Sequence, residues 1–152
     1  MEEAITEELP GAVLFACSQN SIRSPMAAGI LRHFMGHRIF VDSAGVRAGD
    51  ISGFAEAVMD EIGIDISDHE PKSFDDLVDT SFDLVISLSP EAHHTAIELT
   101  RTNSLDAIYW ATFDPADASG SREQILDAYR SVRDALMKKI KQRFVATAAP
   151  NV

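Results

Sequence analysis

The sequence predicts an α/β fold in which a four-stranded parallel sheet carries helices on both of its faces. Two short apolar runs, AVLFAC at residues 12–17 and DLVISL at residues 83–88, are typical of buried parallel strands. Stretches in which apolar residues have helical spacing follow along the chain. This alternation of strands and helices favours a parallel sheet covered by helices.

Two further strands are expected at residues 38–43, with the sequence RIFVDS, and at residues 107–110, with the sequence AIYW. The four strands together suit the order 2-1-3-4, which is the flavodoxin-like arrangement. In such sheets ligands bind at the carboxyl ends of the strands, beside the point where the strand order reverses. That point lies next to the first strand, which ends at Cys17.

Three helices are expected within the first hundred residues. The first follows Pro25, where apolar residues recur at helical spacing, and Gly36 is a suitable C-terminal stop. The second covers about residues 53–62. The third begins at Ser89-Pro90, because serine is a good N-cap and proline suits the first helical position.

The last helix has the clearest signature. Ser121 and Gln124 form an S-x-x-Q capping box. One apolar stripe then follows at helical spacing, formed by Ile125, Tyr129, Val132, Leu136, Ile140 and Phe144. Lysines near its end suit the negative end of the helix dipole.

Length and charge limit the classes of function. A chain of 152 residues is large enough for one core, and we expect a single domain over residues 12–146. Residues 1–11 form an acidic leader, consistent with a mobile tail, and residues 147–152 form a C-terminal tail. The net charge of −11 argues against nucleic acid or an anionic membrane as a partner. The acidic start does not resemble a signal peptide, so the expected compartment is the cytoplasm.

The single cysteine of the chain lies in a motif that can bind an oxyanion. CSQNSIRS fits the pattern C-x5-R-S, with Cys17 followed by Arg23 and Ser24. A short loop between a strand and a helix N-terminus can turn several backbone N–H groups toward one tetrahedral anion. Arg23 adds a planar fork that can bind two oxygens at once. The same positive field favours the thiolate form of Cys17, so nucleophile and anion site are one feature.

The alternative interpretation is that Cys17 is a buried apolar residue and Arg23 a surface charge. Isolated cysteines are usually of that kind. The context nevertheless favours the functional interpretation, because a strand precedes the motif and a Ser-Pro helix start follows it at the predicted ligand-binding edge.

The segment VLFACSQNSIRSPMAAGIL resembles the opening of the low-molecular-weight protein tyrosine phosphatase family, whose superfamily includes arsenate reductases. The resemblance extends through VDSAG, IGIDISDH, FDLVISLSPEA and FDP, over about residues 12–140. It implies that Cys17 is the nucleophile, Arg23 the phosphate-binding arginine, and Ser24 a hydroxyl that assists the thiolate. The phosphate-binding loop would comprise Ser18, Gln19, Asn20, Ser21, Ile22, Arg23 and Ser24. The resemblance also implies that Asn20, Ser43 and His69 brace this loop. Asparagine suits the loop because it tolerates positive φ.

A phosphocysteine mechanism also needs an acid for the leaving group, which then serves as base for water. Asp114, in an Asp-Pro loop after the last strand, should lie at the same edge of the sheet as Cys17. The resemblance places the general acid here. Asp117 is the weaker second candidate.

These features predict a metal-independent and cofactor-independent phosphomonoester hydrolase, with a phosphotyrosyl protein or a small aryl phosphate as substrate. No metal site is expected, and His93 and His94 are interpreted as surface residues near a helix start. Two alternatives stay open: an arsenate reductase coupled to a small-molecule thiol, and a phospho-residue binding module without turnover. A relay through further cysteines is excluded because the chain has only Cys17.

Four departures from the family pattern bear on the substrate. Ile22 stands where many family phosphatases carry a second cysteine, and Gln19 stands where a glycine is frequent. The segment SAGVRAGD lacks the aromatic residue usual after SAG, and Ala116 and Asp117 replace the aromatic residues usual after Asp-Pro. With less aromatic stacking, phosphotyrosine should be recognised less selectively.

Overall fold

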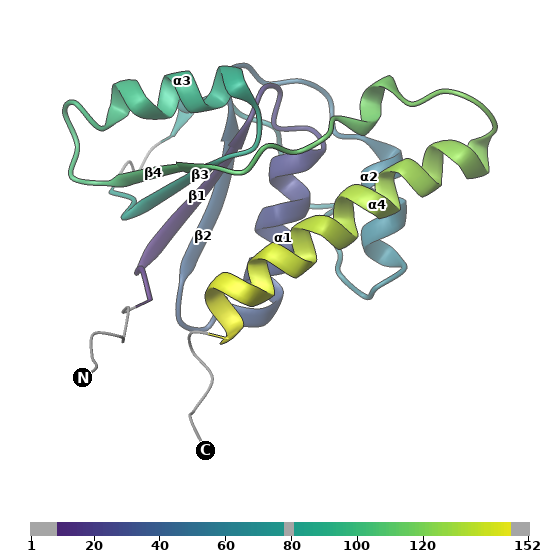
Figure 1. The fold of residues 1–152 in the computed structure, drawn as a ribbon, viewed down its shortest axis with the longest axis horizontal. Coiled ribbons are helices and arrows are strands. Elements are labelled where there is room, and N and C mark those ends of the chain that lie inside the picture. Colours follow the sequence, from purple (N-terminus) through teal and green to yellow (C-terminus); the bar gives the residue numbers. More distant parts are fainter. Residues whose placement is uncertain (1–8, 78–80, 147–152) are drawn as a thin grey trace.

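A four-stranded parallel sheet lies at the centre of the computed structural model, which describes residues 9–77 and 81–146 (Figure 1). The strand order is β2-β1-β3-β4, so the predicted 2-1-3-4 arrangement is confirmed. The predicted tail over 147–152 and most of the predicted leader over 1–11 lie outside the described residues. The strands are β1 (Ala12–Cys17), β2 (Phe40–Gly45), β3 (Leu84–Ser87) and β4 (Asp106–Tyr109). The helices are α1 (Arg23–Met35), α2 (Gly53–Asp60), α3 (Pro90–Leu99) and α4 (Arg122–Ile140), which runs on into a π-helical segment (Lys141–Val145).

The alternating side chains of β1 enter two different cores. Val13 and Phe15 belong to the larger core, which contains buried residues of α1, α2 and α4. Leu14 and Ala16 belong to the smaller core under α3. Because successive side chains of a strand point to opposite faces, this division places helices on both sides of the sheet, as predicted. Figure 1 shows α3 on one side of the strands and the other three helices on the opposite side.

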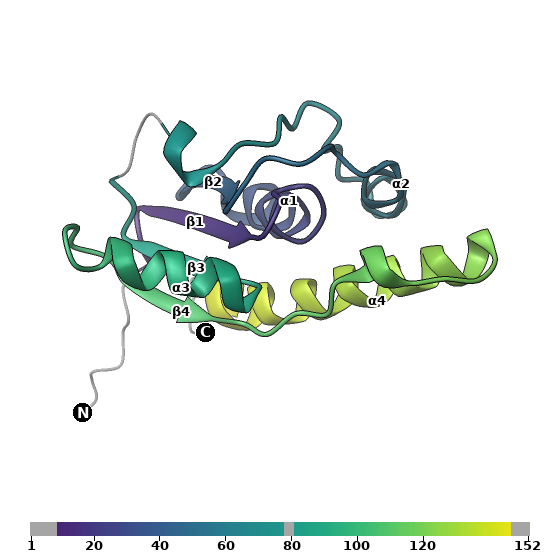
Figure 2. The same ribbon diagram turned by 90° about the horizontal axis from the view of Figure 1, so that it is seen from above.

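The helix α2 lies away from the sheet, beyond α1 and alongside α4 (Figure 2). It ends at Asp60, two residues before the predicted end, and the chain turns at Gly63, whose φ is +79°. Ser52 caps its N-terminus by accepting a hydrogen bond from the N–H of Ala55. In the sheet, β1 lies between β2 and β3, so the loop that follows β1 lies between the loops that follow these two strands.

Two element boundaries differ from the sequence prediction near α1 and β2. The helix begins at Arg23 rather than after Pro25. Proline is tolerated in this first turn because the first helical N–H groups have no partner inside the helix, so the missing N–H of Pro25 costs no hydrogen bond. The strand β2 begins at Phe40 rather than residue 38, since the N–H groups of Arg38 and Ile39 bond to Met35 at the end of α1. The strand then continues to Gly45, opposite Cys17.

Other predicted elements agree closely with the structure. The capping box of α4 is confirmed, with Ser121 Oγ accepting from the N–H of Gln124 and the Gln124 side chain accepting from the N–H of Ser121. Ser89 caps α3 as predicted. The predicted strands 83–88 and 107–110 are present as β3 and β4, each within two residues of the predicted limits. Within residues 9–77 and 81–146, no helix is both long and apolar enough to cross a membrane.

Candidate active site

The loop that follows β1 lies at the carboxyl edge of the sheet, where β1 has β2 on one side and β3 on the other. It ends where α1 begins, at Arg23. The N-cap residue of α1 is Ile22, which provides no side-chain hydrogen bond to the helix N-terminus. The positive end of the helix dipole is therefore directed toward the loop without a capping side chain to neutralise it.

The backbone carbonyls of residues 17–21 all bond to partners outside the loop. A trans peptide places its C=O and its N–H on opposite sides, so the next N–H in each case faces the centre of the loop. The arrangement is therefore a ring of inward N–H groups, which suits a tetrahedral oxyanion. The outer bonds are Val46 N to Cys17 O (3.1 Å), Arg47 N to Ser18 O (3.0 Å), Gly49 N to Gln19 O (2.8 Å), His69 Nε2 to Asn20 O (2.8 Å) and Ser52 N to Ser21 O (3.3 Å).

The sulfur of Cys17 lies at the base of this ring and is almost fully buried, with 2% of the residue exposed. The N–H of Asn20 donates to Sγ at 3.3 Å, and Ser24 Oγ lies 2.9 Å from the same atom. Both groups can donate a hydrogen bond to a thiolate. The environment therefore stabilises a negative charge on sulfur.

A cavity of about 70 Å³ opens above the sulfur. Its volume suits a phosphate-sized group rather than a whole substrate. The residues around it come from the loop and from the Asp-Pro segment, so the predicted nucleophile and the predicted general acid line the same cavity. They are Cys17, Ser18, Gln19, Ser21, Ile22, Arg23, Asp114 and Ala116.

Arg23 is buried, and backbone carbonyls of the segments that follow β3 and β4 accept hydrogen bonds from it. One guanidinium nitrogen donates to Leu88 O at 3.2 Å and to Thr112 O at 3.0 Å. The other terminal nitrogen lies 3.5 Å from Oδ2 of Asp114. These contacts orient the guanidinium against the wall of the cavity and connect it to the segment after β4.

Asp114 is the N-cap of a short 3-10 helix (Pro115–Asp117), because its Oδ1 accepts from the N–H of Ala116 at 3.0 Å. Its side chain is 40% exposed and faces the cavity beside Arg23. Asp117 is exposed and is not among the lining residues. The structure therefore brings Asp114, and not Asp117, to Cys17.

The three residues predicted to brace the loop form one network around Asn20. Its backbone has a φ of +56°, which asparagine tolerates better than most residues, and the residue is completely buried. Its side-chain amide donates to Ser24 Oγ and Ser43 Oγ, both at 2.9 Å. Its Oδ1 accepts from the backbone N–H of Lys72 at 2.9 Å, a contact that no sequence pattern indicates.

His69 completes the network from outside the loop. Because a carbonyl can only accept, the ring Nε2 carries the proton that binds Asn20 O. Partial burial lowers the pKa of His69 below its ordinary value, partly offset by this hydrogen bond, which raises it. A larger cavity of about 660 Å³ borders His69, but neither Cys17 nor Arg23 lines it.

The segment from residue 45 to residue 52 was expected to affect the site only through its lack of an aromatic residue, yet it also holds the phosphate-binding loop in place. It supplies most of the donors that turn the loop carbonyls outward. Gly45 permits this close approach, since a Cβ there would lie 2.6 Å from Arg47 O and 2.7 Å from Asn20 N. The two glycines of SAGVRAG were the available signal.

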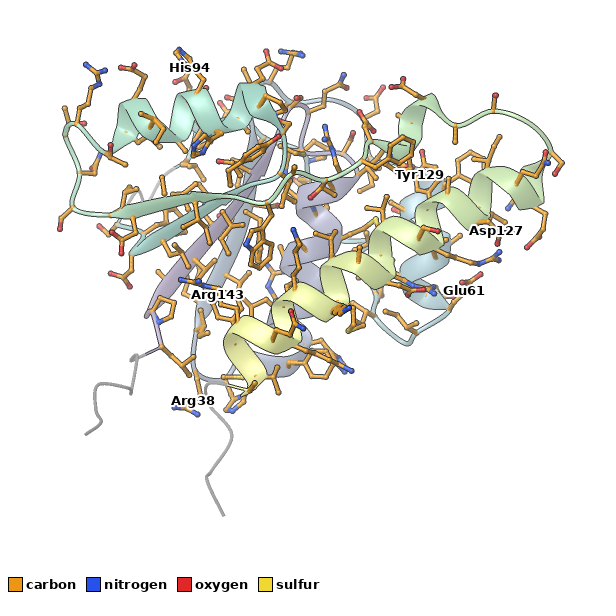
Figure 3. The ribbon with its side chains drawn as sticks, viewed as in Figure 1. Arg38, Glu61, His94, Asp127, Tyr129 and Arg143 are labelled. Carbon is orange, nitrogen blue, oxygen red and sulfur yellow. The ribbon has the colours of Figure 1, made fainter. Side chains whose placement is uncertain are left out.

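One prediction outside the site needs correction. His94 is exposed and points away from the sheet, as expected (Figure 3). His93 is half-buried, and its ring stacks on Tyr109 at a centroid distance of 5.2 Å. The interpretation of His93 as a surface residue is therefore wrong, because α3 packs against β4 at this position.

The family model and the relatives of known name agree on one superfamily. The model of the family described as "Low molecular weight phosphotyrosine protein phosphatase" matches residues 12–148. An arsenate reductase of Halalkalibacterium halodurans is 34% identical over 129 residues, covering 85% of this chain and 91% of that protein.

Solved structures, two of which serve as examples, are also similar in fold and sequence. A low molecular weight protein tyrosine phosphatase from T. tengcongensis is 28% identical with a TM-score of 0.73, covering 89% of this chain and 98% of that one. An arsenate reductase in a phosphate-binding state is 27% identical with a TM-score of 0.70, covering 90% of this chain and 98% of that one.

Proposed function

We propose that this chain, which belongs to the low molecular weight phosphotyrosine protein phosphatase family, hydrolyses phosphomonoesters through a phosphocysteine formed on Cys17. The substrate class is phosphotyrosyl protein and small aryl phosphates, encountered in the cytoplasm. The observation that carries the proposal is the outward direction of every carbonyl from residue 17 to residue 21, which leaves a ring of N–H groups around the sulfur.

In the first step the thiolate of Cys17 attacks phosphorus, and the bond from phosphorus to the ester oxygen breaks. Inward N–H groups and the guanidinium of Arg23 hold the other phosphoryl oxygens and stabilise the charge that develops on them. Asp114, as the carboxylic acid, gives its proton to the departing oxygen. The alcohol or phenol then leaves the open side of the cavity.

In the second step water attacks the phosphocysteine. Asp114, now a carboxylate, takes the proton of that water, and the bond from phosphorus to sulfur breaks. The thiolate that departs is stabilised by the Ser24 hydroxyl at 2.9 Å and by the N–H of Asn20 at 3.3 Å. Inorganic phosphate is released, and Asp114 is again protonated for the next cycle. The positive charge this requires is supplied by Arg23 and the backbone, so the mechanism uses no metal.

The test is hydrolysis of p-nitrophenyl phosphate by the wild type and by Cys17→Ser, each with and without a chelator. We expect chelator-independent turnover in the wild type and none above background in the variant. In Asp114→Asn, mass spectrometry after an acid quench should find a phosphoryl group on the peptide containing Cys17. Turnover that survives Cys17→Ser or requires a divalent metal would overturn the mechanism.

A second candidate is arsenate reduction coupled to a small-molecule thiol. It is supported by the H. halodurans relative, which is named an arsenate reductase. Cys17 is the only cysteine of the chain, so an external thiol must supply the electrons. Arsenate reduction with glutathione, in the absence of phosphatase activity, would favour this candidate. Tight phosphate binding with neither activity would instead indicate a binding module.

A further inference from the structure

The side chain of Gln19 occupies the space beside Gly49 at the phosphate cavity. The N–H of Gly49 donates to Gln19 O at 2.8 Å, so the two backbones are joined directly. A Cβ on Gly49 would lie 2.5 Å from Gln19 Oε1 and 3.0 Å from Gln19 Cβ. Gln19 is exposed and lines the cavity. A side chain at position 49 and the present side chain at position 19 therefore compete for one volume.

The backbone of Gly49 does not itself require glycine. Among the described residues, the glycines with positive φ are Gly63 and Gly120, so Gly49 has a conformation open to other residues. The nearest atoms that a Cβ at position 49 would meet all belong to Gln19, so this side chain would have to shift to admit one. Position 19 thus carries a side chain where glycine is frequent in the family, and that side chain fills the space that a side chain at position 49 would need.

The side chain at position 19 changes the chemistry of the cavity mouth. None of the residues that line the cavity is aromatic, and Ser18, Gln19 and Ser21 give its lining polar residues. Phe113 is 64% exposed but lines a different groove, between the segment after β4 and α4. A leaving group therefore meets hydrogen-bonding groups at the mouth and no ring on which to stack.

We propose that Gln19 is a specificity-determining residue, whose amide takes the place of a ring-stacking surface and extends the substrate class to phosphomonoesters with hydroxylated alkyl leaving groups. The inference rests on the proposed phosphomonoester hydrolysis. The amide can both donate to and accept from hydroxyl groups next to the ester oxygen. Phenyl leaving groups gain nothing from it, so the preference for aryl esters is reduced.

The experiment compares kcat/KM for phenyl phosphate and for glycerol 3-phosphate in the wild type and in Gln19→Met, which keeps the length of the side chain and removes its amide. We expect the ratio of aryl to glycerol ester to rise about tenfold, the scale of one or two neutral hydrogen bonds. Gln142→Met, an exposed substitution at the other end of the molecule, is the matched control and should leave the ratio unchanged.

An unchanged ratio in Gln19→Met, with both esters hydrolysed, would overturn the inference while leaving the proposed function intact. Failure of the wild type to hydrolyse either ester would overturn the proposed function, and this inference with it. Equal loss of both activities in Gln19→Met would also overturn it, because a structural role alone would explain that result.

A stability measurement tests the packing independently of activity. Gly49→Ala should lower the melting temperature in the wild type, because the new Cβ meets Gln19. In the background of Gln19→Gly the same substitution should have little effect, since the competing side chain is gone. An equal loss in both backgrounds would show that the two positions are not coupled, and would overturn the packing on which the inference depends.

Discussion

The side-chain amide of Asn20 donates a 2.9 Å hydrogen bond to Oγ of Ser24. The same hydroxyl lies 2.9 Å from the sulfur of Cys17, so the amide orients the group that contacts the nucleophile. Because Asn20 also bonds to Ser43, its amide connects the sulfur to the neighbouring strand β2. Positioning of the nucleophile thus depends on a residue that does not itself line the cavity.

Asn20→Ala is expected to reduce both stability and turnover. The substitution leaves buried partners unpaired and puts alanine at a φ of +56°, so the free energy of unfolding should fall by about 2–4 kcal/mol. We expect kcat to fall about 100-fold, the scale of a small misplacement of a reacting group. Urea unfolding and steady-state kinetics measure the two effects. Ser43→Ala removes only one partner and should cost about 1 kcal/mol; an equal loss in both variants would contradict the central position of Asn20.

Asp114→Asn should reveal the leaving-group proton. Asparagine keeps an oxygen that can cap Ala116, but its amide N–H is too weakly acidic to be transferred to the ester oxygen. We expect kcat for phenyl phosphate to fall about 100-fold or more, the usual contribution of a general acid, and kcat for p-nitrophenyl phosphate to fall much less. Asp117→Asn is the matched control and should retain wild-type rates. Equal losses with both esters in Asp114→Asn would exclude it as the acid.

Stability should decline on mild acidification because of His69. Its pKa is lowered in the folded protein, chiefly by partial burial, so the folded state favours the neutral ring. The contribution to stability is complete above the unfolded pKa of about 6.5 and is lost as the pH falls through the folded value. His69→Gln, which can still donate to Asn20 O, removes the titration. The difference in unfolding free energy between wild type and variant should therefore change below pH about 6.5. A difference that stays constant with pH would show that His69 does not cause the loss of stability in acid.

Arg133→Met should loosen the attachment of α2 to α4. Arg133 is buried and donates to Val58 O at 2.8 Å, near the C-terminal end of α2, and to Glu61 at 2.9 Å. Glu61 lies beside α4, where Arg130 also binds it (Figure 3). Removing the buried donor should lower the free energy of unfolding by about 1–3 kcal/mol. Urea unfolding of the wild type and the variant measures this difference.

The control for this substitution is Arg101→Met, at an exposed arginine whose ion pair is with Glu98 on the surface. That change should stay within about 0.5 kcal/mol. Similar losses at both arginines would mean that the buried hydrogen bonds of Arg133 add nothing to the packing of α2.

Local signals in the sequence were sufficient for the elements and for the chemical core of the site. Apolar runs and cap residues place the strands and helices to within a few residues, because they reflect interactions between near neighbours in the chain. The C-x5-R-S spacing joins Cys17 and Arg23 within one loop, so their proximity needs no tertiary information. The common edge of a parallel sheet then predicts that Asp114 meets them.

What only the tertiary structure decided is which distant groups complete the site. The donors that turn the loop carbonyls outward come from the segment after β2, and the carbonyls that hold Arg23 come from Leu88 and Thr112. These are backbone groups, which nearly every residue carries, so side chains do not identify the partners; the glycines of SAGVRAG indicate only a close approach of the chain. The contact of Gln19 with Gly49 likewise depends on how the two segments pack against each other. A sequence thus determines which side chains can react, whereas the packing of segments far apart in the chain determines how they are held and what can reach them.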